Sequence, residues 1–176
     1  MDATGSGSSS VVAAPPDRQT LAGKYLTFHL QQEVYGLAIL KVQEIIGIMP
    51  VTKVPRMPPF VRGVINLRGK IIPVVDLRIQ FGLEAQDDTS KTCIIVVQIL
   101  RDCHKVTMGI IVDEVAEVVD LRDEQIEPPP AFGTTVSTDF LLGMGKLAQK
   151  VVMLLDVDRV LASEQVALAE QMESNH

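Results

Sequence analysis

One stretch of this chain occurs twice, and that duplication limits the folds available to it. Residues 63–77 read GVINLRGKIIPVVDL, and residues 143–157 read GMGKLAQKVVMLLDV. The two stretches align without a gap, so that Gly63 matches Gly143, and an apolar run precedes an aspartate in each. A segment repeated at a fixed spacing indicates a repeated structural unit.

A second pair of similar segments lies upstream of the first pair. Residues 35–45 read YGLAILKVQEI and residues 108–118 read MGIIVDEVAEV, with Gly36 matching Gly109. Either match alone could arise by chance in a valine-rich chain. Because both pairs occur in the same order, they predict an internal duplication.

The local pattern of the repeated stretch predicts a β-hairpin followed by a short helix. Two runs of β-branched and aliphatic residues, 63–67 and 71–75, flank the sequence Arg68-Gly69-Lys70. Such runs are typical of strands joined by a tight turn. Pro73 predicts an edge strand or a bulge because proline has no N–H to donate, and Asp76 can cap a helix that begins at residue 77.

About five short strands are expected in each copy, mostly antiparallel. Short strands with exposed edges are most stable when the sheet curls into a small barrel. We therefore predict a mainly β fold with two small five-stranded β-barrel subdomains, related by an internal pseudo-two-fold axis and meeting at an apolar seam. Period-3.6 hydrophobicity predicts a C-terminal helix over 157–172, and the Gly/Ser-rich residues 1–23 predict a flexible tail.

Composition excludes several classes of partner. The net charge is −6 and no basic cluster is interleaved with aromatic residues, which argues against nucleic acid or an anionic membrane as the main partner. No apolar run approaches the ~18 residues of a membrane span. The two cysteines, Cys93 and Cys103, lack the spacing of a metal motif and fit a reducing cytosol. A cytoplasmic protein without cofactor or metal is expected.

Catalytic patterns are also missing from the sequence. There is no P-loop, no G-x-G-x-x-G and no G-x-S-x-G, and the three histidines are scattered. The acidic pairs Asp113-Glu114 and Asp156/Asp158 are explained by a strand connection and a helix start, where negative charge is favourable. We therefore expect that the chain is not an enzyme.

Three motifs give the chain a family resemblance. YGLAILKVQEI (35–45), FVRGVINLRGKIIPVVDLR (60–78) and STDFLLGMG (137–145) resemble the CheW family of bacterial chemotaxis coupling proteins over about residues 25–169. The resemblance implies intertwined barrels in one domain over 24–170, with subdomains at about 34–90 and about 92–155 and strand exchange. It also implies a non-catalytic scaffold that couples chemoreceptor tips to the histidine kinase CheA in membrane-associated arrays.

The resemblance also implies two contact surfaces. In the family the receptor tip lies in the groove between the barrels, and the kinase regulatory domain contacts their outer ends. Glu127 departs from this pattern, because relatives carry a basic residue there. The implied receptor-binding residues are Val42, Glu44, Arg68, Met108, Gly109 and Val115, and the implied kinase-binding residues are Val51, Val54, Met57 and Phe132.

Two other functions remain open from the sequence. The chain could serve another sensory kinase pathway through the same contacts. It could also be an enzyme or a small-ligand binder that uses the inter-barrel groove, although that requires convergent polar groups where the expected residues are mostly apolar.

Overall fold

The computed structural model describes residues 21–84, 87–101, 103–130 and 140–162, and these are mostly β-strand. The strands are β2 (Gly23–Leu30), β3 (Glu33–Ala38), β4 (Val42–Gly47), β5 (Val61–Leu67), β6 (Lys70–Asp76), β7 (Cys93–Arg101), β8 (His104–Val112), β9 (Glu114–Leu121), β10 (Ile126–Glu127), β11 (Leu141–Leu147) and β12 (Lys150–Leu155). Two single-turn helices, α2 (Leu77–Gln80) and α3 (Val157–Val160), follow the two repeated stretches. Each helix is capped by an aspartate side chain, Asp76 or Asp156, which accepts a backbone N–H.

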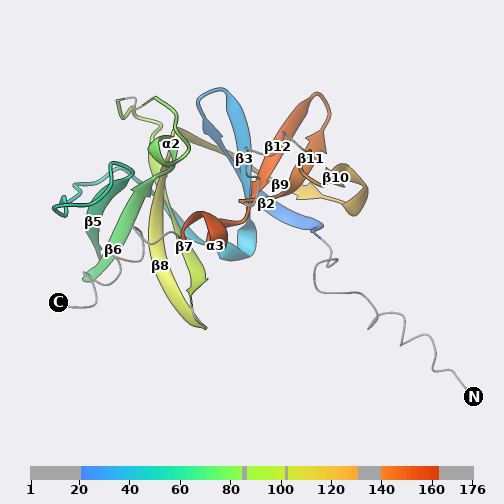
Figure 1. Ribbon diagram of the computed structural model, residues 1–176. Coiled ribbons are helices and arrows are strands. Elements are labelled where there is room, and N and C mark those ends of the chain that lie inside the picture. Colours follow the sequence, from blue (N-terminus) through green and yellow to red (C-terminus); the bar gives the residue numbers. More distant parts are fainter. Residues whose placement is uncertain (1–20, 85–86, 102, 131–139, 163–176) are drawn as a thin grey trace, which may run out of the picture.

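The strands form two sheets that lie side by side, with α3 between them (Figure 1). One sheet has the order β10-β11-β12-β3-β2-β9, and the other has the order β4-β7-β8-β6-β5. The first sheet has a sixth strand because the two-residue β10 is added to it. The prediction of a mainly β fold with few short helices is therefore confirmed.

Each sheet takes its first hairpin from the opposite half of the sequence. The β2–β3 hairpin belongs to the sheet that holds β9 to β12, and the β7–β8 hairpin belongs to the sheet that holds β4 to β6. Each borrowed hairpin is attached by a parallel ladder, where Leu154 pairs with Gly36 and Val74 pairs with Gly109. These two pairings are equivalent under the sequence repeat. The exchange is reciprocal, so no single cut in the chain separates the two sheets.

Both sheets curl, and in the five-stranded sheet the chain leaving β4 returns to β5. Thr52 and Val64 exchange backbone hydrogen bonds of 2.8 and 2.9 Å. Gly63 permits this approach, because a Cβ atom at this glycine, whose φ is +140°, would lie 2.0 Å from the Thr52 carbonyl oxygen. Glu127 of β10 pairs with Met144 at the equivalent place in the other sheet.

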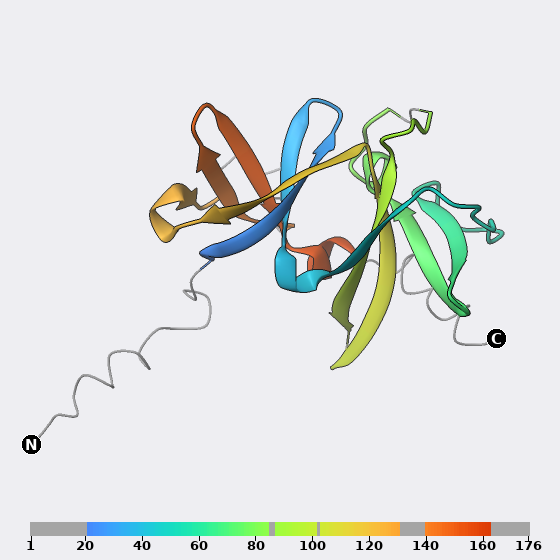
Figure 2. The ribbon, with the colours of Figure 1, turned by 180° about the vertical axis from the view of Figure 1, so that it is seen from behind.

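Three apolar clusters form the core. Small clusters lie inside each sheet, around Ile72 in the five-stranded sheet and around Val152 in the six-stranded sheet. The third and most extensive cluster lies between the sheets and includes Phe28, Met108 and Leu161. Since burial of each such side chain contributes about 1.5–3 kcal/mol, the seam is part of the folding unit. In the reverse view β9 runs across from one sheet to the other (Figure 2).

Some boundaries and roles differ from the sequence prediction or lie outside the described residues. β2 begins at Gly23, the last residue of the predicted tail, and most of that tail lies outside the described range. The predicted C-terminal helix is described only as α3, and the rest of 157–172 lies outside the described range. Pro73 lies in β6, an interior strand, but outside the parallel ladder with β8, which begins at Val74. The proline therefore occupies a locally unpaired side of an interior strand.

Candidate protein-binding surfaces

The β5–β6 turn presents Arg68 to solvent. Arg68 and Gly69 both have left-handed backbone torsions, with φ of +53° and +87°, as a two-residue hairpin turn requires. The Asn66 side-chain oxygen accepts a hydrogen bond of 2.9 Å from the Gly69 N–H and holds the turn. The Arg68 side chain is 66% exposed, so the turn displays a cation.

Arg68 forms an ion pair with Glu44 of β4. β4 and β5 stand at opposite ends of the strand order, so the pair joins the two edges of the curled sheet, as the Thr52–Val64 bridge does. In the second copy, Ala148 replaces Arg68, and Glu117 lies 4.0 Å from Lys150 instead. The arginine is therefore a feature of one copy only.

Val42 and Val115 occupy equivalent positions in the two copies and have similar surroundings. Both side chains are half-buried and pack against the core between the sheets. A β-bulge accompanies each of them, since the register of β4 shifts after Val42 and that of β2 shifts opposite Val115. They are the apolar residues of the predicted receptor set that retain exposed area.

Met108 and Gly109 are buried in the isolated chain. The Met108 side chain has no exposed area and lies in the core between the sheets. Gly109 has no room for a side chain, because a Cβ atom there would lie 2.8 Å from Cγ2 of Ile94. These two residues are therefore inaccessible in the isolated chain, whereas Val42, Glu44, Arg68 and Val115 keep exposed side-chain area.

The predicted kinase-binding residues of the first copy lie between β4 and β5. Val51, Val54 and Met57 are all half-buried, and Figure 2 shows this segment at the end of the five-stranded sheet far from the other sheet. Phe132 lies outside the described residues. Glu127, at the equivalent end of the other sheet, pairs with Lys146 at 2.6 Å, so its negative charge is partly neutralised.

A cluster of charged residues missed by the sequence analysis ties the two sheets together. Arg78 of α2 is almost fully buried and donates hydrogen bonds to Asp76 at 2.9 Å and Asp113 at 3.0 Å. Hydrogen bonds to Asp76, together with those to Asp113, raise the pKa of Arg78 despite its burial. Asp113 in turn accepts a hydrogen bond from the Gln31 N–H at the tip of the β2–β3 hairpin. The "VDLR" sequence holds two members of this cluster, but the others are distant in sequence.

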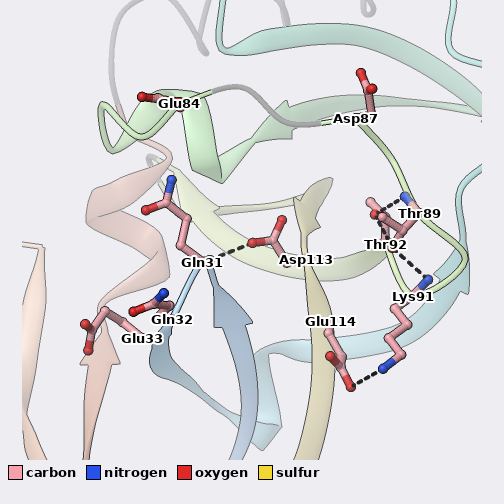
Figure 3. Close-up of a pocket in the computed structure, with 10 residues that line it drawn as sticks. All are labelled: Gln31, Gln32, Glu33, Glu84, Asp87, Thr89, Lys91, Thr92, Asp113 and Glu114. Carbon is pink, nitrogen blue, oxygen red and sulfur yellow. Dashed lines mark hydrogen bonds and ion pairs between the residues drawn. The ribbon is translucent and has the colours of Figure 1, made fainter.

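A polar hollow of about 650 Å³ opens beside this cluster (Figure 3). Its walls are the β2–β3 turn, the segment between α2 and β7, and the β8–β9 corner at Asp113 and Glu114. No group of three or more potential metal ligands gathers within the described residues. Burial raises the pKa of the Cys93 thiol, which makes it a poor nucleophile. The described lining of the hollow is polar and mostly charged.

The fold and these surfaces define a class of protein: an interlocked two-sheet module whose surface carries half-buried valines and an exposed ion pair. Within the described residues, no helix is long and apolar enough to cross a membrane.

Comparison with known proteins identifies the family. The model of the CheW-like domain matches residues 24–165, and the chain belongs to this family. It is 39% identical to the chemotaxis protein CheW of Klebsiella aerogenes over 158 residues, which cover 90% of this chain and 93% of the relative. It is 32% identical to CheW of Bacillus subtilis, covering 80% of this chain and 88% of the relative.

A solved structure agrees with this assignment. The crystal structure of the scaffolding protein TtCheW from Thermoanaerobacter tengcongensis superposes with a TM-score of 0.72 at 38% sequence identity, covering 82% of this chain and 96% of TtCheW. The predicted family is confirmed, and with it the role of a chemotaxis scaffold.

Proposed function

We propose that this chain couples the cytoplasmic tips of chemoreceptors to the histidine kinase CheA, without performing chemistry of its own. It would act in the cytoplasm at membrane-associated receptor arrays. The observation that carries the proposal is the exposed ion pair between Arg68 and Glu44, because Glu44 lies two residues along β4 from Val42, which packs half-buried at the margin of the core between the sheets.

The chemistry of this margin suits a helical partner. Exposed charge flanks apolar side chains that are only half-covered by the chain itself, and an amphipathic helix places apolar anchors in such sites. The Arg68–Glu44 pair is too exposed to stabilise the fold by more than about 0–1 kcal/mol. Its guanidinium is available to a partner's carboxylate, which arginine can bind through two donors.

The kinase contact is proposed for the outer end of the five-stranded sheet. Val51, Val54 and Met57 present partly exposed apolar surface there, in the segment that Figure 2 shows at the end of this sheet far from the other sheet. Phe132 is proposed as an anchor in the corresponding contact of the second copy. Separate surfaces would allow both partners to bind at once.

The test is binding of a receptor cytoplasmic fragment to Arg68→Ala. We expect weaker binding with an unchanged melting temperature. Lys24→Ala is the matched control, because Lys24 also forms an exposed ion pair, with Asp120 at 3.3 Å in the six-stranded sheet, and it should bind normally. Equal binding by Arg68→Ala and the native chain would contradict the receptor assignment.

A ligand-binding function is not favoured. Two of the six residues predicted for the groove are buried and two are half-buried valines. A single exposed ion pair remains among the six, which is not a set of convergent polar groups. An adaptor of another sensory kinase pathway would use the same surfaces. Capture of CheA in preference to other kinases would distinguish a chemotaxis adaptor from such a protein.

A further inference from the structure

The two ends of the seam are equivalent under the sequence repeat, but the charge that the short helix contributes is opposite at the two ends. Arg78 of α2 corresponds to Asp158 of α3, and Asp113 at the β8–β9 corner corresponds to Leu40 at the β3–β4 corner. At the first end Arg78 and Asp113 are 3.0 Å apart. At the second end Asp158 accepts hydrogen bonds from Lys41 Nζ at 2.7 Å and from the Leu100 N–H at 3.0 Å.

The chain itself covers the first end. After α2, the segment leading to β7 crosses this end, where Asp88 pairs with Arg62 at 2.8 Å and with Arg78 at 3.2 Å. Thr92, near the end of this segment, is buried. The segment is therefore held over the end of the seam by charges that face it.

The second end has an apolar hollow, and two of the leucines that line it are exposed. The hollow, of about 260 Å³, is lined by Leu40, Lys41, Leu100 and Lys105, with Gln98 and Ile99 beneath. Leu40 is 94% exposed and Leu100 is 56% exposed. Two large aliphatic side chains at one hollow form an apolar surface that water contacts unfavourably.

We propose that the C-terminal segment, residues 164–172, docks in this hollow. The repeat aligns this segment with residues 84–92, of which Asp88 and Thr92 cover the first end, so the duplication indicates the C-terminal segment as the occupant. The described chain ends at Ala162, four residues beyond Asp158, whose side chain already binds Lys41 and the Leu100 N–H at the hollow. The tether is therefore short.

The sequence of the segment matches the chemistry of the hollow. Val166, Leu168 and Met172 supply apolar side chains for Leu40 and Leu100. Glu164, Glu170 and Glu173 give the C-terminal end a negative charge, opposite to that of Lys105 and Lys41. The first end shows the same relation, since arginines hold an acidic segment there through Asp88.

The test uses a nitroxide label on Cys103, which is exposed at the β7–β8 turn, about 10 Å along the strand from Leu100. The full chain carries Cys93→Val so that only one thiol reacts. We expect loss of most of the amide NMR signal of residues 164–172. Leu40→Glu should restore these signals, as should Lys105→Glu, whereas the matched control Val118→Glu, at another exposed aliphatic residue in β9, should not.

Each outcome decides the proposal. Full signals over 164–172 in the labelled chain would overturn it. Signal loss that appears only when labelled chains are mixed with separate isotope-enriched chains would also overturn it, because a second copy would then be the occupant. Restoration by Lys105→Glu with an unchanged melting temperature would support docking even if Leu40→Glu fails to fold. Receptor and kinase capture are measured separately. The docking proposal can therefore fail while the proposed function stands.

Discussion

Arg78 lies 3.0 Å from Asp113, and this contact joins helix α2 of one sheet to the corner where the chain leaves for the other. Asp113 also accepts the Gln31 N–H at 2.6 Å, and its own N–H donates to the His29 carbonyl at 3.1 Å. A single carboxylate thus binds the β2–β3 hairpin and α2 at the same time. The relative orientation of the sheets, and with it the seam, depends on this partly buried carboxylate.

Replacement of Arg78 by alanine should destabilise the fold strongly. It leaves the buried Asp76 carboxylate without its main partner, and loss of one member of a buried pair costs about 3–5 kcal/mol. Urea denaturation measures this change. Arg159→Ala is the control, because Arg159 is 63% exposed and lies 3.6 Å from Asp156, and it should change stability by at most about 1 kcal/mol. Similar losses in both variants would show that the Arg78 cluster has no special role.

Gly109→Ala should destabilise the protein by about 1–3 kcal/mol, the usual cost of overpacking. The added methyl group would lie 2.8 Å from Cγ2 of Ile94 and 3.4 Å from Cγ2 of Val74, at the parallel ladder between β6 and β8. Gly47→Ala is the matched control in β4, where nothing lies within 4 Å of the added atom. It should be neutral or slightly stabilising. Thermal melting compares the two variants. An unchanged melting temperature for Gly109→Ala would contradict the expected overpacking at the parallel ladder.

Asp88 should contribute stability that depends on pH. Burial alone would raise its pKa, but hydrogen bonds from Arg62 and Arg78 lower it below its ordinary value. The carboxylate is therefore favoured in the folded state, so its contribution is complete above the unfolded pKa of about 3.9 and is lost as pH falls through the lower folded pKa. The stability difference between the native chain and Asp88→Asn should shrink as pH falls below about 4. A difference that stays constant down to acid unfolding would contradict this account.

Local patterns predicted the elements of the fold but not how they pair. The residues around Asn66 and Gly69 determine a tight turn, and that turn is present. By contrast, the β2–β3 hairpin could in principle pair with β6 of its own half or β12 of the other. Because the two halves repeat one pattern, residues near each strand do not distinguish these choices, and the exchange was implied only by the family resemblance.

The candidate binding surfaces, like the fold, could be predicted only in part from the sequence. Glu44 and Arg68 were both named from the resemblance, and the structure brings them together as an ion pair. The burial of Met108 was not foreseen, because alternation along a strand does not reveal which face a second sheet will cover. The Arg78 cluster was missed because its carboxylates lie 2, 10 and 35 residues away from the arginine.

A double-mutant cycle should find little stability in the Arg68–Glu44 pair. With the arginine 66% exposed and the glutamate 32% exposed, we expect a coupling of about 0–1 kcal/mol in the free protein. The pair's role is proposed to be in binding, so Arg68→Ala should lower receptor affinity more than it lowers stability. Denaturation of the four variants in parallel gives the coupling, and a value of several kcal/mol would reassign the pair to the fold.

The most direct test of the scaffold is a three-component mixture of this chain, a receptor cytoplasmic fragment and CheA, assayed for joint capture and receptor-controlled kinase phosphorylation. The native chain should bring both partners into one complex. Arg68→Ala should lose the receptor and keep the kinase, while Val54→Asp should lose the kinase and keep the receptor. If either folded variant loses both partners together, or if both variants retain both partners, the account of two separate surfaces on one scaffold is wrong.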